Sequence, residues 1–224
     1  MKMKQIVACA ALFAATGISA PAFAGATGNV GVFSEYLFRG VEQSGGAAVQ
    51  GGLDYASDSG FYVGTWLSNT NFANGTDGVS YETDVYAGYS TKLGDVGFDI
   101  GALYYHYTDS DSLNTIEGYV GLSAGMFSAK AFYTPDYFGT DESAYYVTGT
   151  ATFPLSASVN LAVNAGYNAG DGVKAFLGDE YLDYGATIVK TLDAGFVFSL
   201  GVINTDIDGD DPKAVLGLKK TFEL

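Results

Sequence analysis

The fold is decided by residues 79–92, which read Val-Ser-Tyr-Glu-Thr-Asp-Val-Tyr-Ala-Gly-Tyr-Ser-Thr-Lys. From Val79 to Tyr89 the odd positions are mainly apolar, whereas the even positions include Glu82 and Asp84. Successive side chains of a strand point to opposite faces, so this segment has one apolar face and one charged face. The same alternation recurs in residues 96–104, 159–168, 182–188 and 196–202.

Alternation alone would also suit a soluble sandwich, and the connections separate the two cases. Long polar loops are expected at residues 43–47, 69–78, 109–114, 134–143, 168–180 and 204–212. Compact turns are expected between them, at residues 57–60, 93–95, 124–125, 154–156 and 191–194. Long loops at one rim and short turns at the other are typical of outer-membrane barrels.

The sequence therefore predicts an all-β fold, a transmembrane antiparallel up-and-down β-barrel of about 12 strands. The range is about 10 to 14 strands, because residues 48–55 and 127–133 alternate weakly. An even number of strands puts both ends of the barrel at the periplasmic rim.

Residues 1–24 have the pattern of a signal peptide. Lys2 and Lys4 precede an apolar stretch at residues 6–18, and Ala22-Phe23-Ala24 is a small-x-small cleavage pattern. The apolar stretch is shorter than the ~20 residues of a spanning helix. We expect cleavage after Ala24 and one barrel domain at residues 25–224, without the only cysteine, Cys9.

Composition and charge agree with a membrane barrel. The 48% of hydrophobic residues are dispersed, and the 15% of aromatic residues suit the girdles at the bilayer interfaces. Loss of Lys2 and Lys4 takes the formal net charge from −15 to −17, which excludes nucleic acid as a partner. The expected location is the outer membrane of a Gram-negative bacterium, with lipid, lipopolysaccharide and small solutes as partners, and a homo-oligomer is left open.

Several acidic residues lie on the polar face of their strands and are predicted to face the lumen. An acid facing lipid at mid-bilayer would cost up to about 2–4 kcal/mol. If the lumen is open, the electrostatic field of these acids would favour cations. Alternatively, the acids hydrate the inner wall or pair with Arg39 and Lys130. The candidate selectivity residues are Glu35, Arg39, Glu82, Asp84, Asp99, Glu117 and Asp183.

Arg39 is the only arginine of the chain. The pattern places it near the outer end of the first strand, with Glu35 four residues away on the same face. It is either a fixed cation that constricts a pore or a structural tie to buried carboxylates beside Gln43 and Gln50. The tie is favoured slightly, because the guanidinium fork suits pairing in a crowded interior.

Catalysis and metal binding find little support. His106 is the only histidine of the chain, and the alternation of residues 96–104 places its side chain on the outer face, next to Tyr105 and Tyr107 in the sequence. A place in the aromatic belt at the bilayer interface explains it better than a catalytic role. The acids at residues 206–211 lack the glycine and glutamate spacing of a calcium loop. We therefore expect no enzyme, no cofactor and no specific metal site.

Residues 34–40, 43–44, 50–55 and 60–69 resemble the opening of the TorF family of porins, and residues 82–89 resemble its next strand. The resemblance is detailed over about the first third of the mature chain. It implies a pore-forming barrel and carries no catalytic residues over. The chain end departs from the usual barrel pattern, because Lys220 interrupts the last apolar parity and Leu224 replaces a terminal aromatic residue.

The sequence leaves two functions open. The first is a passive outer-membrane diffusion channel for small polar, mainly cationic solutes. The second is a closed structural or adhesive barrel with acidic surface loops. Bulky residues on the predicted lumen face favour the second function: Phe33, Leu37, Leu103, Tyr105 and Tyr107.

Overall fold

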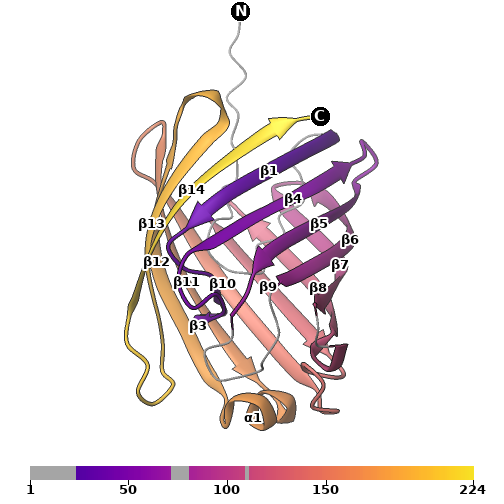
Figure 1. Cartoon of the computed structure of the whole chain (residues 1–224). Coiled ribbons are helices and arrows are strands. Elements are labelled where there is room, and N and C mark those ends of the chain that lie inside the picture. Colours follow the sequence, from indigo (N-terminus) through magenta and orange to yellow (C-terminus); the bar gives the residue numbers. More distant parts are fainter. Residues whose placement is uncertain (1–23, 72–80, 109–110) are drawn as a thin grey trace, which may run out of the picture.

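The computed structural model describes residues 24–71, 81–108 and 111–224, so all of the expected signal peptide except Ala24 lies outside it. Twelve strands of this part of the chain close into a barrel (Figure 1). They are β1 (Gly25–Phe33), β4 (Ala48–Ala56), β5 (Phe61–Asn69), β6 (Tyr81–Leu93), β7 (Val96–Tyr107), β8 (Thr115–Ala124), β9 (Phe127–Thr134), β10 (Ala144–Pro154), β11 (Val159–Ala169), β12 (Tyr181–Thr191), β13 (Phe196–Thr205) and β14 (Lys213–Glu223).

The remaining elements are short. A two-stranded hairpin is formed by β2 (Leu37–Phe38) and β3 (Val41–Glu42). The helical pieces are η1 (Asp111–Leu113), α1 (Asp171–Leu177) and η2 (Asp193–Gly195). Within the described ranges, no helix has the length and apolar character needed to cross a bilayer.

The sheet is antiparallel and up-and-down throughout. Each wall strand pairs with its sequence neighbours, and β1 closes the barrel on β14 with Thr27 opposite Glu223 and Phe33 opposite Gly217. The two weakly alternating segments form β4 and β9 because each is paired on both sides. The prediction of a transmembrane barrel of about 12 strands is confirmed.

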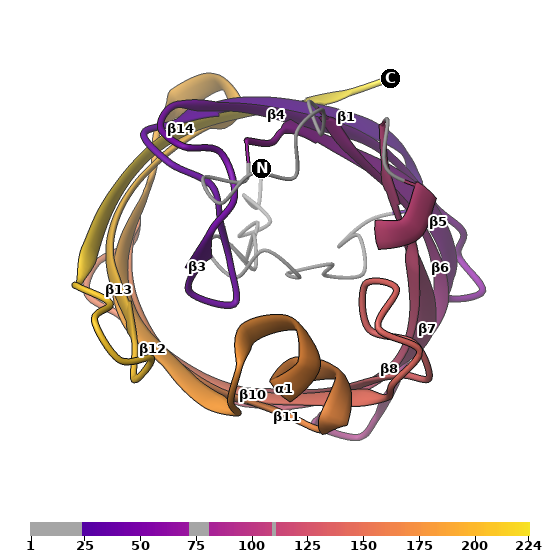
Figure 2. The same ribbon diagram turned by 60° about the horizontal axis from the view of Figure 1, so that its bottom comes forward.

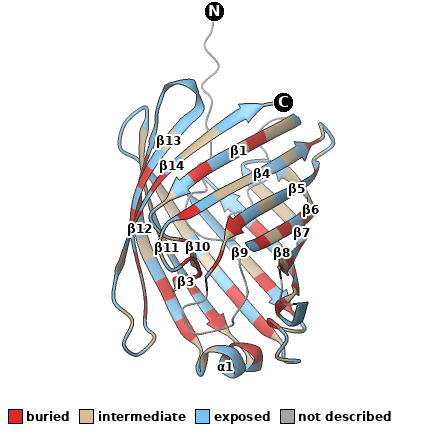
Figure 3. Cartoon of the chain, viewed as in Figure 1, coloured by how far each residue is buried: buried red, intermediate tan, exposed pale blue. Residues whose placement is uncertain are grey.

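The alternation of apolar and polar residues predicted from the sequence is observed in the strands of the barrel wall. In β6, Glu82 and Asp84 are buried while Tyr81 and Val85 are about half exposed, and Figure 3 shows this alternation of buried and exposed residues along the strands. Large apolar side chains thus cover the outside of the barrel. This arrangement places the apolar parity against lipid and the charged parity in the lumen.

The connections are sorted by length, as predicted. The long ones, which include α1, lie at one end of the barrel, and the short turns lie at the other end with the C-terminus and the start of β1 (Figure 1). We call these ends the loop-side rim and the turn-side rim. The buried lumen-facing positions concentrate in the loop-side half of the wall (Figure 3).

One expectation about the wall is wrong. The first strand was expected to continue past Arg39 to a loop at residue 43, but β1 ends at Phe33. Residues 34–47, here called the inner segment, turn into the barrel and carry the β2–β3 hairpin (Figure 2). Arg39 and Gly40 form its two-residue turn, with φ of 48° and 84°, the backbone of a tight hairpin.

Candidate functional site in the barrel lumen

Tyrosine rings fill the space left by inward-facing glycines. Gly64 lies opposite Tyr86 and Gly101 lies opposite Tyr119 on neighbouring strands, and in each case the ring covers the glycine. A glycine on the lumen face has no side chain and would by itself leave room inside the barrel. That room is largely occupied by these rings, which narrow the lumen and give it a hydroxyl-rich surface.

The turn-side half of the lumen contains a polar cluster around Asp99. Lys130 Nζ lies 2.8 Å from Asp99 Oδ2, and the Tyr62 hydroxyl donates to Asp99 Oδ1 over 2.6 Å. Tyr119 shares a hydrogen bond of 2.5 Å with Tyr62, and the Lys130 ammonium lies 4.7 Å from the Tyr119 ring centroid. Threonine and asparagine line the neighbouring wall at half-buried positions: Thr148, Thr150, Thr152, Asn160 and Asn164.

The inner segment packs across the loop-side half of the lumen. The Tyr36 hydroxyl lies 3.1 Å from each carboxylate oxygen of Glu82 on β6. Phe38 makes edge contacts with Tyr105 on β7 at 5.7 Å and with Phe138 at 5.8 Å between ring centroids. The segment is thus anchored to the wall by both a hydrogen bond and aromatic packing.

Arg39 is at the centre of this packing and is only 2% exposed. Its Nη2 donates to both oxygens of Glu117, at 2.6 Å and 2.8 Å. The guanidinium also lies against three rings, with 4.2 Å to the centroid of Tyr146, 4.7 Å to Phe38 and 5.4 Å to Phe132.

The positive charge of Arg39 is stabilised by Glu117. Burial lowers the pKa of Arg39, but the negative charge of Glu117 outweighs this effect and the pKa is raised overall. Arg39 is therefore a permanent cation inside the lumen. The Tyr105 hydroxyl donates to Glu117 Oε2 over 2.9 Å and completes the carboxylate's surroundings.

The expectation that Arg39 and Glu35 share one face of the first strand is wrong. Because the first strand ends at Phe33, the two residues do not share a wall face, and Arg39 pairs with Glu117 instead. Glu35 is half-buried where the inner segment begins, and its pKa is raised by burial and by the neighbouring Glu42.

The other predicted lumen acids fall into two places. Glu82, Asp84, Glu117 and Asp183 are buried in the loop-side half, whereas Asp99 belongs to the turn-side cluster. Asp183 accepts hydrogen bonds from the Tyr146 hydroxyl at 3.2 Å and from Asn168 Nδ2 at 3.3 Å.

Two charged atoms in this region are less well satisfied. Among the residues that the structure describes, Asp84 Oδ1 and Arg39 Nε are buried without a hydrogen-bond partner. A buried polar atom without a hydrogen-bond partner costs free energy, so these two atoms oppose the stability of the packing around them.

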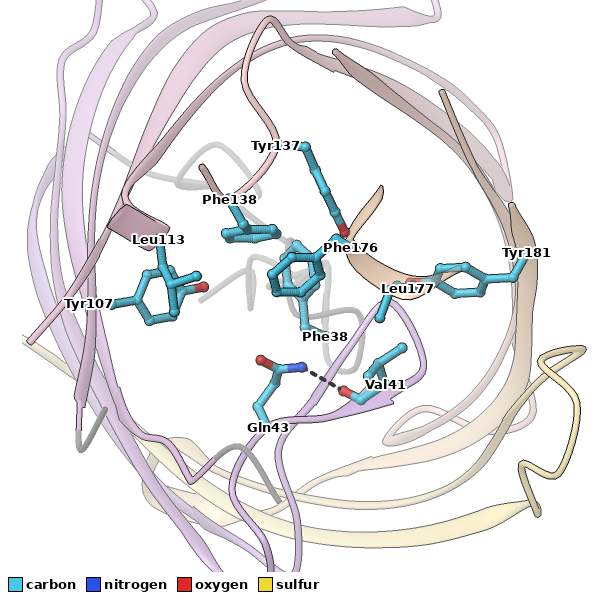
Figure 4. A pocket seen from close by; sticks show the side chains of 10 residues that line it. All are labelled: Phe38, Val41, Gln43, Tyr107, Leu113, Tyr137, Phe138, Phe176, Leu177 and Tyr181. Atoms are coloured by element: carbon cyan, nitrogen blue, oxygen red, sulfur yellow. Dashed lines mark hydrogen bonds between the residues drawn. The ribbon is translucent and has the colours of Figure 1, made fainter. Parts of the chain in front are cut away.

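Sequence reasoning missed the aromatic lining of the loop-side mouth. Figure 4 shows side chains from the inner segment, the wall, the 135–143 loop and α1 converging on one pocket, where Gln43 Nε2 donates to the Val41 carbonyl at 3.1 Å. Its lining is Phe38, Val41, Gln43, Tyr107, Leu113, Tyr137, Phe138, Phe176, Leu177 and Tyr181. The adjacent apolar pairs Tyr137-Phe138 and Phe176-Leu177, unusual in polar loops, were the available signal.

Two further sequence candidates lie outside this site. His106 faces outward, as expected, and stacks on Tyr104 with 6.4 Å between the ring centroids. In the acidic loop, Asp210 accepts from Lys213 Nζ at 2.5 Å and from Thr205 Oγ1 at 2.6 Å. Within residues 24–71, 81–108 and 111–224 there is no group of three or more His, Cys, Asp or Glu arranged to hold a metal ion.

Comparisons with known proteins agree with the barrel. A family model described as "Bacterial protein of unknown function (Gcw_chp)" matches residues 15–221, and the curated proteins contain no match. The TorF resemblance is not confirmed by these comparisons.

Solved outer-membrane barrels share the fold at low sequence identity. A KdgM porin is 14% identical with a TM-score of 0.61, covering 88% of this chain and 99% of that chain. A NanC porin is 13% identical with a TM-score of 0.60, covering 89% and 100%. The COG4313 outer membrane channel from Pseudomonas putida F1 is 11% identical with a TM-score of 0.54, covering 92% and 98%. At these identities the similarity establishes the fold alone.

Proposed function

The chain belongs to the Gcw_chp family of bacterial proteins of unknown function, and we propose that it is an outer-membrane channel through which small polar, mainly cationic solutes diffuse. The leader at residues 1–24 is removed, and the barrel sits in the outer membrane of a Gram-negative bacterium with its turn-side rim toward the periplasm. No catalytic step is part of this function.

The observation that carries the proposal is the separation of apolar and acidic residues across the wall. Side chains such as Val85, Ile188 and Leu200 are more than 40% exposed on the outside, where lipid would cover them. The inside carries buried or half-buried acids at positions 54, 82, 84, 99, 117 and 183. A closed sheet with this polarity is suited to enclosing a water-filled path through a bilayer.

The lumen charge points to cations. Arg39, Lys130 and Lys219 are the basic residues placed among those acids, and two of them are already paired, Arg39 with Glu117 and Lys130 with Asp99. The remaining acids are in excess, and charged groups in a low-dielectric wall raise the local concentration of counter-ions.

The structural relatives support a channel without fixing its solute. One solved relative is described as "KdgM porin in complex with disordered oligogalacturonate". Oligogalacturonate is a polyanion, and an excess of lumen acids would repel such a molecule. The fold therefore supports the channel role, and the charges of this chain support cations as the solute class.

The closed structural barrel is the second candidate, and the inner segment favours it. Arg39, Phe38 and Tyr36 on this segment are each at most 5% exposed, so the segment is tightly packed across the lumen. A barrel in which this packing is permanent would have no path for solutes.

Planar-bilayer recording separates the two candidates. The folded barrel is reconstituted with residues 34–47 in place and, separately, with those residues replaced by Asn-Gly, a two-residue hairpin turn that can join the paired residues Phe33 and Ala48. The channel predicts discrete conductance steps with potassium preferred over chloride. Silence of both well-folded barrels would reject the channel and favour the structural barrel.

A further inference from the structure

We propose that the inner segment, residues 34–47, is a releasable plug, and that the Arg39–Glu117 pair is the latch that holds it in the lumen. The inference rests on the proposed channel function and adds its regulation. In the plugged arrangement the loop-side half of the lumen is filled, and release of the segment opens the path.

Past Ser34, which exchanges two hydrogen bonds with Leu216 on β14, the inner segment lies outside the strand pairing of the wall. Phe33 and Ala48, the residues that flank it, are cross-strand partners at the end of the β1–β4 pairing. The register of the closed barrel therefore does not depend on where the segment lies. Gly45 and Gly46, with φ of 63° and 131°, precede the return to β4 and provide a hinge that other residues would resist.

The segment also holds its own shape. The Tyr36 amide donates to Ser44 Oγ over 2.8 Å, and the Gln43 amide donates to the Tyr36 carbonyl over 2.8 Å. Ser44 Oγ also donates to the Gly46 carbonyl over 2.5 Å. Together with the β2–β3 pairing, these bonds let the segment leave the lumen as a unit.

The backbone is left-handed at the tip of the plug. Arg39 adopts a φ of 48°, in the left-handed region that a long side chain rarely occupies. Such a conformation persists only where surrounding contacts enforce it. The tight β2–β3 turn imposes it here, and the Glu117 carboxylate and the rings of Tyr146, Phe38 and Phe132 hold the side chain in place.

The tip reaches across the lumen to the opposite wall. Arg39 contacts β8, β9 and β10 through Glu117, Phe132 and Tyr146. At Gly40 a Cβ would lie 2.5 Å from the methyl group of Thr205 on β13 and 3.2 Å from Asp183 Cβ on β12. Among the described contacts of the tip, the ion pair is the one between opposite charges, so its loss removes the strongest reason for the cation to stay buried.

The charge on each side of the latch gives a specific test. With Glu117→Gln the buried Arg39 loses its counter-charge, and with Arg39→Gln the plug loses its cation. Both variants should raise the mean open probability in planar bilayers at least about tenfold, because an unpaired buried charge favours the hydrated, unplugged state. The double variant should open less than either single one, since it removes the ion pair without leaving an unpaired buried charge.

Two controls separate the latch from other roles of these charges. Lys174→Gln removes a loop-side cation that lies 2.9 Å from Glu180 at the surface, and should change the open probability less than about twofold. A role of Arg39 and Glu117 as fixed lumen charges alone would shift potassium preference in opposite directions in the two variants. The latch requires both variants to change open probability in the same direction.

A tether tests movement of the plug directly. Cysteines at positions 40 and 205, in a mature chain with no other cysteine, are close enough to bridge and would fix the tip to β13. In the Glu117→Gln background, the oxidised tethered protein should lose the increase in open probability, and reduction should restore it. The same sample before and after reduction serves as its own control for folding.

The outcomes distinguish the plug from the channel. Increased opening in both latch variants and in the Asn-Gly replacement, suppressed by the oxidised tether, supports the plug. Equal conductance of the wild type, the latch variants and the replacement overturns the plug and leaves the channel standing. Silence of every variant, including the replacement, overturns the channel and the plug with it.

Discussion

The ring of Tyr86 on β6 covers Gly64, its direct partner on β5, so closely that a Cβ on Gly64 would lie 2.5 Å from the ring atoms. The same relationship joins Tyr119 to Gly101 between β8 and β7. Each pair places an aromatic side chain over a glycine of the inner wall. Glycine at these positions is thus part of how a narrow barrel accommodates many tyrosines.

Gly64→Ala should destabilise the barrel by about 1–3 kcal/mol, because the added methyl group must displace the Tyr86 ring. The free energy of unfolding in urea, measured in lipid vesicles, checks this. The matched control is Gly118→Ala on β8, where a Cβ has no neighbour within 4 Å. Equal losses in the two variants would show that the glycine backbone, and not the ring contact, is what matters.

Leu200→Lys should destabilise the barrel in lipid by about 2–4 kcal/mol if position 200 lies near mid-bilayer. Leu200 is 42% exposed on the outer face of β13. Thr150→Lys on β10, whose side chain is half-buried on the lumen face, should be nearly neutral in the same vesicles. A reversed order of the two losses would invert the assignment of inside and outside.

The wall could be predicted from the sequence because it depends on patterns within short segments, namely residue alternation and loop length. The alternation around Glu82 and Asp84 fixes which side chains face the lumen, and loop lengths fix which rim is which. Even the weak segment at residues 48–55 forms a strand, since a barrel must pair every strand with two neighbours.

The inner segment could not be predicted because its contacts are long-range. Arg39 meets Glu117, 78 residues away, and Tyr36 meets Glu82, 46 residues away. Period-2 alternation carries no information about which lumen side chains meet across the barrel. A local signal existed in the Arg39-Gly40 turn between the apolar residues Phe38 and Val41, but arginine is uncommon in the left-handed turn that a tight hairpin needs.

The Glu180 carboxylate should titrate far below an ordinary glutamate. It accepts hydrogen bonds from the Tyr167 hydroxyl at 2.5 Å, from Lys174 at 2.9 Å and from the Gly170 amide at 3.2 Å, which lower the pKa of Glu180 to about 2. Because the pKa is lowered on folding, this contribution to stability is complete above the ordinary value of 4.5 and is lost as the pH falls toward 2.

Carbon-13 NMR titration of the Glu180 carboxyl group measures this midpoint. Lys174→Gln should raise the midpoint because one donor is removed, whereas Lys213→Gln, at the start of β14, should leave it unchanged. A wild-type midpoint near 4.5 would mean that the cluster around α1 does not form in solution.

Glu82→Gln combined with Asp84→Asn should reduce the preference for potassium over chloride, because it removes two lumen acids that have no basic partner among the described ion pairs. The reversal potential under a salt gradient reports the change. Asp208→Asn combined with Asp211→Asn removes the same charge from an exposed loop and should have a much smaller effect. Unchanged reversal potentials in the lumen variant would exclude these two acids from selectivity.

The reversal potential of the wild-type barrel under a tenfold potassium chloride gradient tests the central claim most directly. An acidic lumen that conducts ions predicts a potential displaced toward the potassium equilibrium potential. A potential displaced toward that of chloride, or silence of both the wild type and the barrel with residues 34–47 replaced, would contradict the proposed cation channel.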